Sequence, residues 1–145
     1  MANRVQAANN ALAAVLEAAF SDAKYKHFRN PDGQRAFDRA DFVVSLMDDE
    51  EPETVNVISG PIYDLKLTPL VTLASKQGSA ERRDDAWSAV DFVRDALAAD
   101  VTLGGVVEDA RIEAVEPADM DRSKWAGGGL DLTIRMLFAA PTAAG

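Results

Sequence analysis

The amino-acid sequence predicts an α+β domain in which a mostly antiparallel sheet has two helices packed on one face. Apolar and polar residues alternate from Ile62 to Ala74 and again from Leu130 to Ala140, as in strands with one buried face. Apolar residues also recur at three- and four-residue spacings in segments 3–20 and 79–99, which is typical of amphipathic helices. At 145 residues the chain is long enough for a single core. We expect one domain over 1–140 and a flexible tail over 141–145.

The first element is predicted to be a helix from Asn3 to Phe20. Its apolar stripe consists of Val5, Ala8, Leu12, Val15, Leu16 and Ala19. The opposite face is only weakly polar, which leaves room for a protein neighbour; it carries Gln6, Asn9, Asn10 and Glu17.

The next segments predict short strands joined by turns. A short strand begins near Tyr25, and a turn-rich, charged loop follows from Arg29 to Asp41, with Pro-Asp-Gly as its clearest turn signal. Phe42 to Met47 is a strand rich in β-branched and aromatic residues, and Thr54 to Ile58 prolongs the sheet. We expect these strands to form an antiparallel meander, because their connections are too short for a helical crossover.

The long strand from Ile62 to Ala74 contains Pro69, which removes a donor from the ladder. The strand therefore lies at a sheet edge there, carries a bulge, or breaks into two pieces.

The second half of the chain predicts a helix followed by two strands. Ser79 is the expected N-cap, with Glu81 in the first turn, and the buried stripe is Ala86, Val90, Val93 and Leu97. Leu103-Gly104-Gly105 ends this helix, and a strand follows over 106–115. A loop over 116–129 leads to the last strand.

Composition limits the classes of function. The formal net charge of −9 and the scattered basic residues argue against binding to the nucleic-acid backbone. The chain has no cysteine, which excludes disulfides, thiolate metal sites and a cysteine nucleophile. No run approaches the roughly 18 apolar residues that span a bilayer, and the N-terminus does not have the pattern of a leader peptide. We therefore expect a soluble, unprocessed protein without membrane contact, and the absence of cysteine fits a cytoplasmic origin.

No pattern in the sequence indicates catalysis, a metal or a cofactor. His27 is the only histidine, and we expect it to be structural or solvated. The acidic run 48–51 is either a solvated turn, a divalent-cation site or an electrostatic patch, but it does not have the ligand spacing of a calcium loop. Gly127-Gly128-Gly129 has no following Lys-Ser/Thr and precedes a strand, so it is not a phosphate loop.

The two long loops are the candidate partner surfaces. Each carries an aromatic residue among charges, Phe37 in 29–41 and Trp125 in 116–129. Such rings either anchor an interface or fold back on the core. The charged neighbours Arg35, Arg39 and Lys124 complete the set of interface candidates.

From the second helix onward the sequence resembles the phage tail terminator proteins, which also occur in gene transfer agents. The resemblance rests on the helix end at Asp100, on Thr102-Leu103-Gly104-Gly105-Val106, on the strand from Asp109 to Glu116, and on the closing strand. In this motif Asp100, Leu103, Gly104 and Gly105 are structural residues. The order of elements extends the likeness over nearly the whole chain.

The resemblance implies a virion structural protein without enzymatic activity or cofactor. Such proteins form a homohexameric ring on the last ring of tail-tube protein, stop tube polymerisation, and present a surface to the head-side connector. DNA passes through the lumen without specific binding, and the ring lies at the tail–neck junction after assembly in the host cytoplasm. Two alternatives remain: a connector, stopper or other tail component, and a small enzyme or ligand-binding module.

Overall fold

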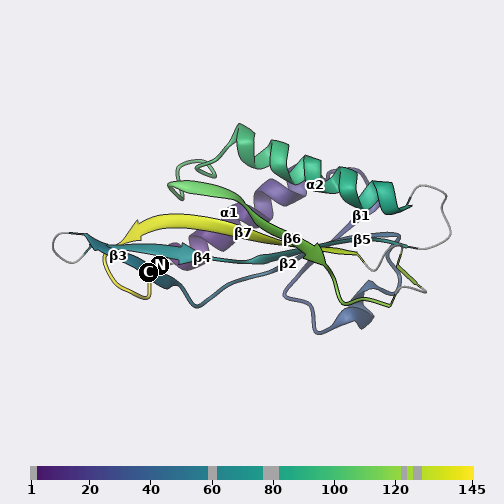
Figure 1. Ribbon diagram of the computed structural model, residues 1–145, viewed down its shortest axis with the longest axis horizontal. Coiled ribbons are helices and arrows are strands. Elements are labelled where there is room, and N and C mark those ends of the chain that lie inside the picture. Colours follow the sequence, from purple (N-terminus) through teal and green to yellow (C-terminus); the bar gives the residue numbers. More distant parts are fainter. Residues whose placement is uncertain (1–2, 59–61, 77–81, 122–123, 126–128) are drawn as a thin grey trace.

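The computed structural model describes residues 3–58, 62–76, 82–121, 124–125 and 129–145. The fold is α+β, with two helices on one face of a seven-stranded, mostly antiparallel sheet (Figure 1). The elements follow one another as α1 (Arg4–Ala19), β1 (Tyr25–Arg29), a 3₁₀ turn (Gln34–Phe37), β2 (Phe42–Met47), β3 (Glu53–Ile58), β4 (Ile62–Leu67), β5 (Leu70–Ser75), α2 (Arg82–Ala99), β6 (Asp109–Pro117) and β7 (Leu130–Ala140).

The closing strand β7 lies at the centre of the sheet. One of its edges pairs with β5 along 130–133 and with β4 along 136–140, and the other edge pairs with β6. β4 and β5 are two pieces of the predicted long strand, which breaks at Pro69. The backbone of Pro69 still accepts a hydrogen bond from Ile134 N at 3.0 Å, so the two pieces continue along the same neighbour.

The predicted antiparallel meander is wrong for the first strands. β1 runs parallel to β2, and β2 pairs with β5 instead of β3. The loop 30–41 carries the chain back without an α-helix; it contains only the 3₁₀ turn and packs on the sheet through Phe37 and Ala40. Among the described strands that precede α2, β3 and β4 are the consecutive pair that forms an antiparallel hairpin.

The main core lies between the sheet and the two helices. The predicted stripe of α1 faces it at Val5, Ala8, Leu12 and Leu16, and that of α2 at Ala86, Val90, Val93 and Leu97. The sheet contributes the alternate residues of β7, whose Leu132, Ile134 and Met136 have no exposed surface. Asn3 caps α1, because its side chain accepts a hydrogen bond from Gln6 N at 2.9 Å. The predicted cap of α2, Ser79, lies outside the described residues.

The motif after α2 folds into a compact turn. Leu103, Gly104 and Gly105 all have positive φ, of 48°, 72° and 89°. Asp100 accepts a hydrogen bond from Gly104 N at 3.0 Å, and Leu103 is buried in the main core. Glycine adopts positive φ without steric strain, so Gly104 and Gly105 avoid that strain at two of the three positions.

The segment 141–145 lies in a turn beside the start of α1. Gly145 N donates to Thr142 O at 3.1 Å, and Gly145 lies against Val5. The C-terminal turn and the start of α1 therefore lie side by side (Figure 1).

Candidate functional site

The two long loops pack together on the sheet face opposite the helices. They form a second hydrophobic cluster with residues of β2 and β5, consisting of Phe37, Ala40, Val43, Ala74, Ala118, Met120 and Trp125. The rings of Phe37 and Trp125 meet edge to face with centroids 6.5 Å apart, and Phe28 contacts Phe37 from the other side.

This cluster changes the role of the two predicted aromatic anchors. Phe37 is 5% exposed and Trp125 is 2% exposed, so neither ring offers surface to a partner. Both rings fold back on the core, which is the second of the two predicted alternatives. The rings hold the loops on the sheet, and this second core makes most of β2 buried on both faces.

The charged interface candidates do lie at the surface. Arg35, Arg39 and Lys124 are exposed. Lys124 Nζ lies 3.8 Å from Asp38 Oδ1, which links the two loops by a weak surface ion pair.

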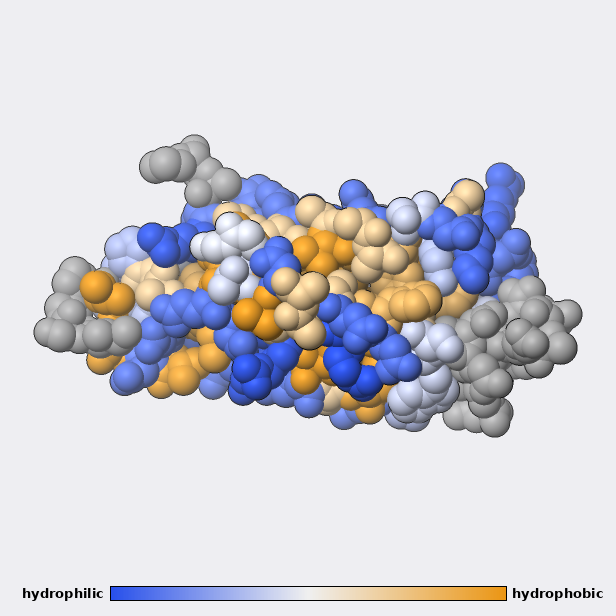
Figure 2. Space-filling view, turned by 90° about the horizontal axis from the view of Figure 1, so that it is seen from above, coloured by the Kyte–Doolittle hydropathy of each residue, from blue (hydrophilic) through white to orange (hydrophobic). Residues whose placement is uncertain are grey.

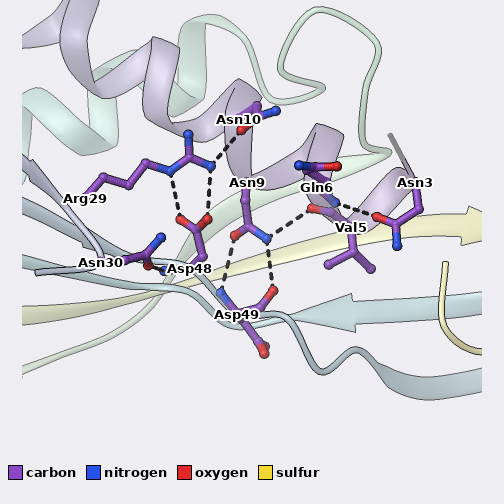
Figure 3. A network of polar contacts seen from close by, with 9 residues as sticks. All are labelled: Asn3, Val5, Gln6, Asn9, Asn10, Arg29, Asn30, Asp48 and Asp49. Atoms are coloured by element: carbon purple, nitrogen blue, oxygen red, sulfur yellow. Dashed lines mark hydrogen bonds and ion pairs between the residues drawn. The ribbon is translucent and has the colours of Figure 1, made fainter. Parts of the chain in front are cut away.

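A polar network joins α1, β1 and the acidic run that follows β2 (Figure 3). Arg29 binds Asp48 through two hydrogen bonds of 3.1 and 3.0 Å, and its Nη2 also donates to Asn10 at 2.7 Å. Asp48 N donates to the side chain of Asn30 at 2.8 Å. The first acidic residue of the run is therefore held by the chain itself.

Asn9 is the buried centre of this network and was not among the predicted site residues. It is 2% exposed, and its Nδ2 donates to Val5 O at 3.0 Å and to Asp49 O at 2.9 Å. Asp49 N donates back to Asn9 Oδ1 at 3.3 Å, so the amide pairs with the backbone as a strand would (Figure 3). The face of α1 that we expected to be free for a neighbour is thus covered here by segment 48–50.

The second acidic residue also has an internal role. Asp49 Oδ2 accepts from Thr68 N at 2.8 Å, and Oδ1 accepts from Glu51 N at 3.0 Å. Asp49 thereby ties the segment that precedes β3 to the break between β4 and β5. Glu50 and Glu51 remain exposed. Within the described ranges, no group of three or more potential metal ligands comes together.

Two hollows beside these features have room for small groups. One, of about 310 Å³, lies over the network and is lined by Asn3, Gln6, Arg29 and Glu50 among others. The second, of about 340 Å³, lies beside the loop cluster on the sheet face and is lined by two carboxylates, Asp119 and Asp131, of which Asp131 accepts a 2.6 Å hydrogen bond from Thr72. The carboxylates of Asp48 and Asp131 are thus already engaged by neighbouring side chains.

His27 has a structural contact. Its Nε2 donates to Phe20 O at 2.8 Å, which fixes β1 to the C-terminal end of α1. This geometry agrees with the expected structural role.

Charged residues on β6 and β7 form a second polar group. Arg111 binds both carboxylate oxygens of Asp109, at 2.7 and 2.8 Å, and Arg135 Nη2 lies 3.7 Å away. The hydrogen bonds from Arg111 hold the pKa of Asp109 below its usual value against the opposing effect of burial, and the charges of both arginines act in the same direction. The same contact raises the pKa of Arg111.

Most of the exposed large apolar side chains lie on two parts of the chain, and Met47, at the end of β2, lies apart from both. The first is the β3–β4 hairpin, where Val55, Val57 and Ile62 are 56%, 58% and 44% exposed. The second follows α2 and the turn after it, at Trp87, Phe92, Val101 and Val106. Figure 2 views the helix side and shows apolar residues gathered along the middle of that face. Such groupings are typical of surfaces that contact other proteins.

The chain was compared with known proteins. No protein-family model matches it, and no curated protein matches it. Among the described residues, no helix is both long and apolar enough to span a membrane.

Proposed function

We propose that this chain is the tail terminator of a tailed particle, a phage or a gene transfer agent. Six copies form a ring on the last ring of tail-tube protein, stop its polymerisation, and join the tail to the head-side connector. The proposal rests on the resemblance carried by the segment from Asp100 to Gly105 and by the closing strands. The α+β fold and its surfaces support it.

The observation that carries the proposal is the β3–β4 hairpin. Its outer strand β3 pairs only with β4 among the described strands, and a bulge at Val55 interrupts the ladder. Val55 and Val57 expose more than half of their surface on this free edge. A soluble chain usually protects such an edge with charge, so exposed valines favour a partner that covers them. We assign the tail-tube protein to this hairpin.

The charge of the chain is compatible with a conduit for DNA. A net charge of −9 disfavours lasting contact with phosphates, because binding them requires clustered cations. DNA therefore passes through the ring without specific binding.

Deletion of the gene in the producing strain, followed by electron microscopy of the particles, tests this function. A terminator defect gives overlong tail tubes beside tailless, DNA-filled heads. Heads that lose their DNA beside tails of normal length would instead identify a connector or stopper. Normal particles would contradict both assignments.

Paired substitutions test the role of the hairpin. Val55→Asp combined with Val57→Asp should leave the fold intact, because both side chains are exposed, and should abolish length control when the variant replaces the native chain. Met47→Asp is the control, since Met47 is 44% exposed but lies outside both groups of exposed apolar residues. Equal loss of function in both variants would show that the hairpin has no special role.

A further inference from the structure

The sheet has two free edges on opposite sides at one end. Along residues 130–133 of β7, β5 occupies one side and β6 the other. The strand order there is β1-β2-β5-β7-β6, so β1 and β6 are the outer strands. In the part of the chain that the structure describes, β1 pairs only with β2 and β6 only with β7.

These two edges carry opposite charge. Segment 24–29 contains Lys24, Lys26 and Arg29 and no acidic residue. Segment 108–116 contains four acidic residues and a single basic one. Arg29 is already bound to Asp48 and Asp109 to Arg111, but Lys26 and Glu116 are exposed and have no ion pair among the described residues.

Lys26 and Glu116 project from the same face of the sheet. One row of paired residues crosses all five strands, from Phe28 through Ser45, Thr72 and Asp131 to Glu116. Lys26 shares the face of Phe28 because side chains two residues apart in a strand point the same way. If the row continued straight into the next copy, Glu116 would lie opposite Phe28 of that copy. A shift of the next copy's β1 by two residues therefore places Lys26 opposite Glu116.

Strand direction also suits a contact between these edges. β1 is parallel to β2, while β2, β5, β7 and β6 alternate in direction, so β1 and β6 run in opposite senses. When two copies stand side by side with the same orientation, β6 of one meets β1 of the next as an antiparallel pair. Antiparallel pairing needs no other element to complete it.

We infer that a second copy of this chain occupies each edge, with β6 of one copy beside β1 of the next and Glu116 facing Lys26. The contact is head-to-tail, which generates a closed ring when the rotation between copies closes. Pairing of two β1 edges or of two β6 edges would bring like charges together, which is unfavourable. This contact would be the subunit interface of the proposed terminator ring. The pairing of the two edges does not depend on the proposed function; only the closure of the copies into a ring rests on it.

Cross-linking of the purified full chain tests the contact directly. Copies labelled with ¹⁵N are mixed with unlabelled copies at the highest soluble concentration and treated with a carbodiimide, which joins an amine to a carboxylate without a spacer. The expected product is a mixed-isotope peptide pair linking Lys26 to Glu116. Its absence under these conditions would overturn the proposal.

Charge reversal provides a sharper test. Lys26→Glu places two carboxylates, and Glu116→Lys two amines, at the point of contact, so each variant alone should associate roughly tenfold more weakly, the change that about 1.4 kcal/mol produces. Equal mixing of the two variants should restore association in alternating order, measured by sedimentation velocity, and so should both substitutions in one chain. Asp95→Lys, an exposed reversal on α2 and on neither edge strand, should have no effect. Variants that associate as well as the native chain would overturn the proposal.

The cross-link and the deletion phenotype are independent results. A 26–116 cross-link in a chain whose deletion leaves particles normal would keep the edge contact and reject the terminator function. Overlong tails without that cross-link would keep the function and reject the edge contact.

Discussion

Replacement of the buried amide of Asn9 gives the most quantitative test of the fold. Asn9→Ala removes hydrogen bonds of 3.0, 2.9 and 3.3 Å and leaves the backbone N–H and C=O of Asp49 without these partners. Each bond contributes about 1 kcal/mol, and the longest contributes less, so the loss is about 2–3 kcal/mol. Alanine returns about 0.6 kcal/mol through its better helix propensity. We therefore expect the free energy of unfolding to fall by about 2 kcal/mol.

Urea unfolding followed by far-ultraviolet circular dichroism measures this change. An unchanged m-value would show that the variant and the native chain unfold in the same way, so that their free energies can be compared. Asn10→Ala is the matched control, because it has the same gain in propensity and loses only one exposed hydrogen bond, to Arg29. The difference between the two variants isolates the buried amide. A difference below about 0.5 kcal/mol would refute its assignment as the link between α1 and segment 48–50.

Three further changes test other parts of the structure. Trp125→Ala should lower the free energy of unfolding by about 3 kcal/mol through loss of the second cluster, whereas its exposed neighbour Lys124→Ala should stay within about 0.5 kcal/mol, both measured in urea. Gly129→Ala should lower the melting temperature more than Gly104→Ala. Both glycines have positive φ, but an added Cβ at Gly129 would lie 2.9 Å from Met120 Sδ, whereas the space at Gly104 is open. Equal melting temperatures of the two variants would contradict this packing. The folded-state pKa of Asp109 lies below its unfolded value, so its contribution to stability is present above the unfolded pKa and is lost as the pH falls through the folded pKa. Asp109→Asn should therefore cost less than about 1 kcal/mol at pH 7, and this cost should shrink as the pH falls through the folded-state pKa of Asp109; a cost that stays constant on acidification would contradict the assignment.

Sequence periodicity predicted the helices and strands because each of them buries the face on which its own apolar residues recur. The strands β2 and β7 and both helical stripes lie where alternation or three- and four-residue spacing places them. The break at Pro69 was one of the three alternatives that its missing donor allowed. The connection between β1 and β2 was not predictable in the same way, because its direction depends on a loop that packs on the far face.

The site residues show the same limit. Phe37 and Trp125 are far apart in the sequence, and only the packed loops bring the rings together. Asn9 had a signal that sequence reasoning missed: it follows Val5 by four residues and precedes Leu12 by three, so it falls on the buried stripe. A polar residue at such a position must have partners within the chain.

Localisation of the chain in the particle is the measurement that tests the proposed function most directly. A peptide tag at the C-terminus, labelled with gold-conjugated antibody on purified particles, should appear at the head-proximal end of the tail, and image averaging there should show a ring with six-fold symmetry. Label at the distal tip, along the tube or on the capsid would contradict the assignment as tail terminator.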